Sequence, residues 1–231
     1  MSMLACGLLQ MDPSQFDSAH DFHVSLTARI SSLSRAGAGL IVLPAYSVMV
    51  GLALQLEAEG RSPCNPFELA RLAGTDGFSV WMDFFAAAAL SNRTYLCPGT
   101  FIASCDGGFE HRAPLFSPDG DLVLVQLQTH VSDAESQAGM AVGADLAVVD
   151  ICGHKVGIAI GTDAWYPEVG RILAPIRSWL RPRCRCPTPS GAKLAGSGRL
   201  SSRTRSSVSR PPLADRGWAR LTRAVRVCSL P

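Results

Sequence analysis

Long hydrophobic runs, a regular cysteine framework and acidic residues near the carboxyl end are all scarce in this 231-residue sequence. No stretch approaches the roughly 18 apolar residues that a membrane-spanning helix needs, and residues 1–11 lack the basic segment of a signal peptide. The eight cysteines are scattered, without the spacing of a disulfide-stabilised secreted domain. These absences argue against a membrane partner and predict a cytoplasmic protein with free thiols.

Charge is divided unevenly along the chain. Residues 1–174 hold 8 Lys and Arg against 18 Asp and Glu, a net charge of 8 − 18 = −10. Residues 175–231 hold 13 basic residues and one acid, a net charge of 13 − 1 = +12. The sequence therefore predicts a folded domain over 1–174, followed over 175–231 by a basic tail rich in Arg, Ser and Pro.

The tail lacks a sustained helix or strand period, so we expect disorder, because it cannot bury enough apolar area to offset its ordering entropy. Three interpretations stay open: sequence read out of frame, a passive solvated tail, and an arm that binds nucleic acid. The first is favoured, since Arg, Pro, Ser and Ala are what a shifted frame of GC-rich DNA tends to encode. Nucleic acid is the least favoured partner, because Trp218 is almost the only aromatic residue available for base stacking.

Strands and helices alternate in the first part of the domain. A strand is predicted over 4–10, and a wholly apolar run over 40–43, ending at Pro44, is typical of a strand buried on both faces. Between them we expect a helix that Asp17 or Ser18 caps and that carries one apolar stripe at helical spacing. The stripe consists of Phe22, Leu26, Ile30 and Leu33.

Hairpins dominate the later part of the domain. Residues 46–74 are predicted to be partly helical with a loop over 62–66, and an amphipathic helix is expected over 78–89. Short strands follow at 95–97 and 101–103, then hairpins over 115–125 and 146–160 with turns at 117–120 and 153–154. This order predicts a mixed α/β sandwich rather than an all-parallel sheet.

Three sequence blocks, in order, resemble the nitrilase superfamily of carbon–nitrogen hydrolases. Residues 37–44 are similar to the family's strand that ends in Pro-Glu, and residues 117–130 to the hairpin that leads to Lys-Thr-His. Residues 153–171 resemble the strand, nucleophile elbow and helix start that carry Cys-x-Asp. The resemblance covers about residues 4–174.

The resemblance implies a partial four-layer α-β-β-α sandwich that is incomplete at its carboxyl-terminal end. It also implies a small amide or nitrile ligand, a homodimer through the outer helices, and no cofactor or metal. Residues outside the three blocks add no metal site: His20 and His23 lack a third ligand, and Cys184 and Cys186 lack a nearby histidine.

The family hydrolyses amide, carbamoyl or nitrile bonds through a covalent intermediate. A cysteine thiolate attacks the carbon, a glutamate shuttles protons and a lysine stabilises the developing charge. Here those positions fall at Ala45 for the glutamate, Gln128 for the lysine and Gly161 for the cysteine. Ala45 cannot take a proton, Gln128 supplies no charge and Gly161 has no side chain, so the resemblance predicts that no catalytic residue is intact.

Glu135, Asp163 and His130 are candidates for retained pocket residues. Glu135 lies where the family often has a second glutamate near the lysine, and Asp163 keeps its place at the elbow. Without a nucleophile these groups could activate only water; otherwise His130 is a structural histidine. Cys152 is a poor replacement nucleophile, because it falls at a hairpin turn on the far side of the strand from the elbow.

Three functions stay open from the sequence. The favoured one is a catalytically inactive relative, either a pseudoenzyme or a gene remnant. The second is a binding or assembly partner of a complete homologue. The third is an active hydrolase of non-peptide carbon–nitrogen bonds, of the amidase, carbamoylase or nitrilase type, that uses an unusual site.

Overall fold

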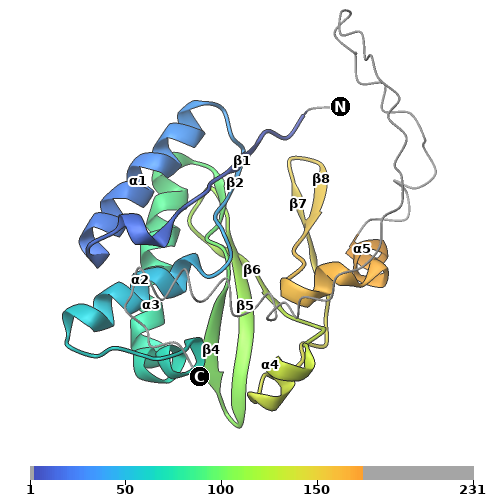
Figure 1. The fold of residues 1–231 in the computed structure, drawn as a ribbon. Coiled ribbons are helices and arrows are strands. Elements are labelled where there is room, and N and C mark those ends of the chain that lie inside the picture. The colour runs from blue at the N-terminus through green and yellow to red at the C-terminus, as the bar shows by residue number, and fades with distance from the viewer. Residues whose placement is uncertain (1–2, 174–231) are drawn as a thin grey trace, which may run out of the picture.

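The computed structural model describes residues 3–173, in which helices alternate with strands before two hairpins follow (Figure 1). The strands are β1 (Cys6–Leu8), β2 (Leu40–Val42), β3 (Tyr95–Cys97), β4 (Phe101–Cys105), β5 (Gly108–Phe116), β6 (Leu122–Leu127), β7 (Val148–Ile151) and β8 (His154–Gly157). The helices are α1 (Ala19–Arg35), α2 (Ser47–Ala58), α3 (Pro66–Asn92), α4 (Asp133–Gln137) and α5 (Pro167–Leu173), with short 3-10 helices η1 (Pro13–Gln15) and η2 (Gly161–Trp165).

The larger sheet combines a parallel part with an antiparallel part. Strand β2 lies between β1 and β3 and pairs with both in parallel, which explains its wholly apolar sequence. Strand β5 then pairs antiparallel with β3, β4 and β6. The predicted strand at 40–43 and the hairpin at 115–125 are thus confirmed, whereas the first half of β5 was missed because polar residues such as Glu110 and Arg112 interrupt it.

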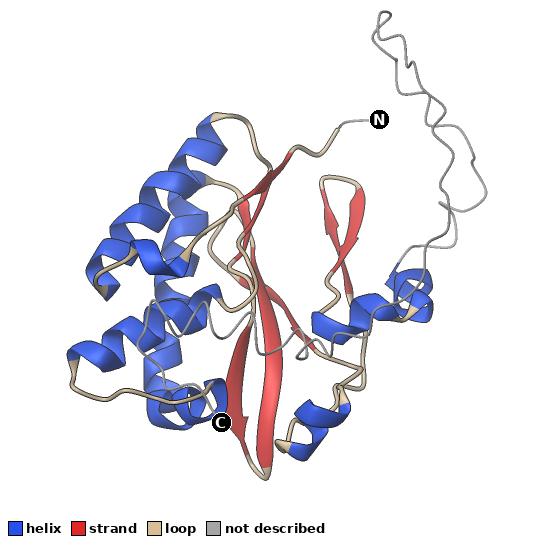
Figure 2. Cartoon of the chain, in the orientation of Figure 1, coloured by secondary structure: helices blue, strands red, loops and turns tan. Residues whose placement is uncertain are grey.

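Helices α1, α2 and α3 cover one face of this sheet (Figure 2). The predicted stripe on α1 faces inward, since Phe22, Leu26 and Ile30 are fully buried. The Ser18 hydroxyl caps α1 by accepting a hydrogen bond from the Asp21 amide at 3.0 Å. The predicted loop at 62–66 is also confirmed, and α3 is kinked at Gly74, where φ is +57°.

The β7–β8 hairpin packs over the opposite face of the larger sheet (Figure 1). A second apolar cluster joins Leu40, Cys97 and Leu115 of the sheet to Ile151 of β7. Helix α5 lies against this hairpin. Gly157 of β8 is so close to Leu173 of α5 that a Cβ on Gly157 would touch the Leu173 side chain. The mixed α/β sandwich with layers in the order helix, sheet, sheet and helix is therefore confirmed, with a second sheet of two strands in residues 3–173.

The predicted tail, 175–231, and its expected disorder lie outside the described residues, so the boundary at 174 stays a prediction. No helix within residues 3–173 is both long and apolar enough to cross a bilayer.

Gly99 provides a test of how the β2–α2 loop is held. Its φ is +83°, and a Cβ there would overlap the carbonyl oxygen of Pro44, the residue before Ala45. We expect Gly99→Ala to lower the free energy of unfolding by at least about 2 kcal/mol more than Gly107→Ala, because the backbone must shift. Gly107 is the matched control: its φ is +94° but nothing lies within 4 Å of a Cβ there, so only the left-handed backbone is penalised, at about 1 kcal/mol. Urea unfolding measures both, and equal losses would contradict the close approach.

Candidate functional site

The fold brings the lysine and cysteine positions of the family resemblance together. Gly161 begins η2 with φ +54°, and a Cβ on it would lie 3.5 Å from Gln128 Nε2, at the end of β6. The Cβ would make ordinary van der Waals contacts, so the turn has room for a side chain but holds none. Gly161 relieves the strain that a non-glycine residue has at this backbone angle.

Ala45, at the glutamate position, lies on the exposed loop between β2 and α2. The next residue, Tyr46, stacks on His111 with ring centroids 5.0 Å apart and planes 11° apart. His111 Nδ1 lies 2.7 Å from Gln128 Oε1. The loop therefore reaches the Gln128–Gly161 pair through His111, although Ala45 itself brings no polar side chain.

Gln128 is almost completely buried, with 1% of its surface exposed, and its amide is fully engaged. Its Nε2 lies 2.8 Å from the His130 carbonyl oxygen, 2.8 Å from Thr162 Oγ1 and 3.2 Å from Glu135 Oε2. An amide nitrogen carries two hydrogens, so these three acceptors leave none for a ligand. Gln128 is therefore a neutral side chain whose amide has partners at both ends.

Glu135 lies beside Gln128 and is held there by a capping box at the start of α4. Its Oε2 accepts hydrogen bonds from the Ser132 amide at 2.7 Å and the Ser132 hydroxyl at 2.8 Å, as well as from Gln128. No Lys or Arg pairs with Glu135 among the described residues. The carboxylate therefore has the neutral amide of Gln128 where the family has a lysine.

Asp163 ties the elbow to the chain that follows β6. Its fully buried carboxylate accepts hydrogen bonds from the amides of Thr129, His130 and Ile160, at 3.0, 2.7 and 3.2 Å. The Thr129 hydroxyl adds another at 2.9 Å. Asp163 is thus a structural acceptor whose charge backbone donors satisfy.

His130 joins Asp163 but is only partly enclosed. Its Nδ1 lies 3.2 Å from Asp163 Oδ1, and its ring stacks on Tyr166 with centroids 4.1 Å apart. Glu135 and Asp163 both lie beside the Gln128–Gly161 pair, so the three predicted pocket residues do converge. They converge around a turn in which residue 161 is a glycine and has no side chain.

Thr162, the residue after Gly161, has a hydroxyl of the kind that can act as a nucleophile. Thr162 Oγ1 accepts from Gln128 Nε2 and donates its own hydrogen to the His130 carbonyl oxygen. A carbonyl oxygen is not a base, and no Lys or Arg contacts this hydroxyl within the described part of the chain. Thr162 therefore lacks the activation that a serine- or threonine-type nucleophile requires.

His111, Thr100 and Tyr46 were missed in the sequence, because they lie outside the three family-like blocks or next to them. Burial lowers the pKa of His111, while its hydrogen bond to Gln128 and the charges of Glu135 and Asp163 oppose that change. Burial, with the charge of Glu135 second, raises the pKa of Tyr46 to about 12. No local signal marks these residues, because Thr100 lies just before β4 and His111 stands between the charged residues Glu110 and Arg112.

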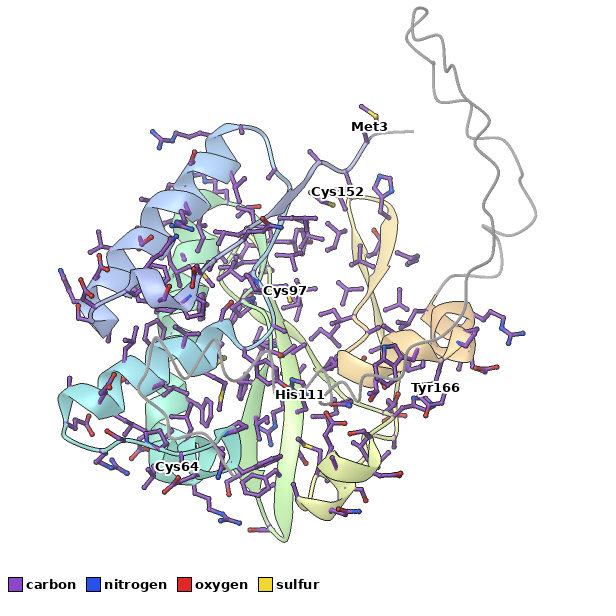
Figure 3. The ribbon with its side chains drawn as sticks, in the orientation of Figure 1. Met3, Cys64, Cys97, His111, Cys152 and Tyr166 are labelled. Carbon is purple, nitrogen blue, oxygen red and sulfur yellow. The ribbon has the colours of Figure 1, made fainter. Side chains whose placement is uncertain are left out.

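The other candidate groups lie away from this site. Figure 3 shows His111 on β5 of the larger sheet and Tyr166 just before α5, whereas Cys152 lies at the far tip of the β7–β8 hairpin. The Cys97 thiol is buried, which raises its pKa and makes it a poor nucleophile. In the part of the chain that the structure describes, no three His, Cys, Asp or Glu side chains gather as metal ligands.

The neutral state of His111 makes stability depend on pH. Its folded pKa lies below the value of about 6.5 expected in the unfolded chain, so the unfolded chain takes up the proton first as pH falls. The His111 contribution is complete above about pH 6.5 and is lost as pH decreases below it, by at most about 1.4 kcal/mol per pH unit. The free energy of unfolding, measured with urea between about pH 8 and 5, should therefore change less with pH in His111→Gln than in the unmodified chain. The exposed His20→Gln is the control, and equal slopes for the His111 variant and the unmodified chain would contradict a neutral buried His111.

Comparisons with known proteins bear on the family and the fold. A sequence model of the family described as carbon-nitrogen hydrolase matches residues 6–178. No curated protein matches the chain significantly. Among solved structures, a carbon-nitrogen hydrolase from Helicobacter pylori G27 superposes with a TM-score of 0.56 at 20% identity, over 73% of this chain and 55% of that one.

An amidase from Nesterenkonia sp. superposes similarly, with a TM-score of 0.57 at 14% identity, over 72% of this chain and 58% of that one. The chain thus spans little more than half the length of these two proteins, and at such identities the likeness shows the fold. The amide ligand, the second copy and the roles of the individual site residues stay predictions. Since the family model covers well over half of the sequence, the chain belongs to the carbon–nitrogen hydrolase family.

Proposed function

We propose that this chain is a catalytically inactive member of the carbon–nitrogen hydrolase family. The observation that carries the proposal is Gly161, which leaves the elbow turn without a sulfur or oxygen atom to attack a carbonyl or nitrile carbon. In the best-studied serine protease case, loss of the nucleophile alone lowers the rate on the order of a million-fold.

The surrounding groups support the same proposal. Gln128 would have to release a hydrogen bond to Glu135, Thr162 or the His130 carbonyl before it could polarise a substrate. Even then a neutral amide stabilises a developing negative charge less than an ammonium group does. Ala45 offers no base on the exposed loop, and His111 is enclosed between Thr100 and Gln128.

The completeness of the hydrogen bonding favours a folded inactive protein over an unfolded remnant. His111, Gln128 and Asp163 are buried, and each has partners at hydrogen-bond distance. A buried polar group without a partner would cost roughly 1–3 kcal/mol. The site has therefore lost the reactive groups without acquiring unsatisfied ones.

Ammonia release tests the absence of hydrolysis. The chain, purified from a host that lacks its own amidases, should release no more ammonia from small aliphatic amides and nitriles than a buffer blank. Thr162→Val is the informative variant, because it removes the hydroxyl that lies beside the elbow. Ammonia release that scales with protein and disappears in Thr162→Val would contradict the proposal and establish a threonine-dependent hydrolase.

Restoring the family residues tests the assigned positions. In the triple variant Ala45→Glu, Gln128→Lys and Gly161→Cys, the new thiol should react with iodoacetamide faster than in Gly161→Cys alone, because a nearby base and cation favour the thiolate. Peptide mass spectrometry separates residue 161 from the exposed Cys6, Cys64 and Cys152. Equal labelling rates in the two folded variants would show that side chains at positions 45 and 128 do not act on the thiol at residue 161.

A further inference from the structure

We infer that Gln128 is a positioning residue that holds the proton of His111 on Nδ1, and so gives one direction to a buried hydrogen-bond chain from Tyr46 to the elbow. The inference stands on the contacts of Gln128 and not on the absence of hydrolysis. It concerns the protonation of a histidine that lies outside the family's catalytic positions.

The orientation of the Gln128 amide is decided by what faces its two ends. One end lies 2.8 Å from the His130 carbonyl oxygen and 3.2 Å from Glu135 Oε2. A carbonyl has no hydrogen, and this Glu135 oxygen already accepts two hydrogen bonds from Ser132. That end must therefore be the NH2 group, since an amide oxygen there would face two acceptors.

The other end of the amide is consequently the oxygen, 2.7 Å from His111 Nδ1. An oxygen without hydrogen needs a donor, so Nδ1 carries the proton. His111 is 3% exposed, and burial favours its neutral form, which has a single N–H. Nε2 is then a bare acceptor and takes the hydrogen of the Thr100 hydroxyl, 2.8 Å away.

With these assignments, every hydrogen bond in the series is donated in the same direction, from Tyr46 toward the elbow. The Tyr46 amide donates to Thr100 Oγ1 at 3.2 Å, Thr100 to His111, and His111 to Gln128. Gln128 in turn donates to Thr162 Oγ1, which donates to the His130 carbonyl oxygen at the elbow. The hydrogens of Gln128 and Thr162 are thereby committed within the protein.

A lysine at position 128 would move the proton of His111 to its other ring nitrogen. An ammonium group has donors only, so His111 Nδ1 would have to accept, and its proton would move to Nε2. Thr100 would then accept from Nε2 and direct its own hydrogen elsewhere. The residue type at 128 therefore decides which nitrogen of His111 is protonated.

Long-range proton–nitrogen correlation NMR on the full 15N-labelled chain distinguishes the two tautomers. We expect His111 to show protonated Nδ1 in the unmodified protein and protonated Nε2 in Gln128→Lys. His111→Gln assigns the signal. Thr162→Val is the matched control: it removes one contact of Gln128 but leaves the His130 carbonyl and Glu135, so the Nδ1 proton should persist.

Protonated Nε2 in the unmodified chain, or an unchanged tautomer in Gln128→Lys, would overturn the inference. Should the lysine variant fail to fold, Gln128→Met takes its place, since it removes the amide oxygen and should end the exclusive Nδ1 form. A methionine variant that keeps the pure Nδ1 signature would equally refute a role for Gln128. These readouts are independent of ammonia release, so the inference and the proposed inactivity can fail separately.

Discussion

The buried carboxylate of Asp163 links the two parts of the site. It accepts hydrogen bonds from the backbone amides of Thr129 and His130 on one side and from Ile160 on the other. Because these donors follow β6 and precede η2, the carboxylate holds the end of β6 against the elbow. The proximity of Gln128 and Gly161, and every conclusion about the site, depends on this link.

A neutral side chain in place of a buried cation changes the energetics of such a site. A buried charge is tolerated only when it is paired and hydrogen-bonded, because desolvation costs several kcal/mol per ion. Gln128 avoids that cost, and its four hydrogen-bond contacts satisfy both ends of the amide. Gln128, His111, Thr100 and Thr162 are joined in one hydrogen-bond network.

The turn at Gly161 is held by its neighbours. Gly161 still adopts φ +54°, although glycine would allow other conformations at this position. The neighbouring contacts explain this: the Thr162 hydroxyl bonds the His130 carbonyl and Asp163 bonds Ile160, so the turn is defined from both sides. The backbone geometry of this turn therefore does not depend on a side chain at position 161.

The sequence by itself determined which side chains stand at the family-like positions and which elements surround them. Residue identity alone decides that Gly161 bears no nucleophile, and local periodicity alone predicts α1 with its buried stripe and the β5–β6 hairpin. Only the tertiary structure decided that Glu135 and Thr162 contact Gln128 and that His111 joins the site. Those contacts link residues between 7 and 34 positions apart, and no local pattern encodes them, because they arise only when separate strands and loops pack together.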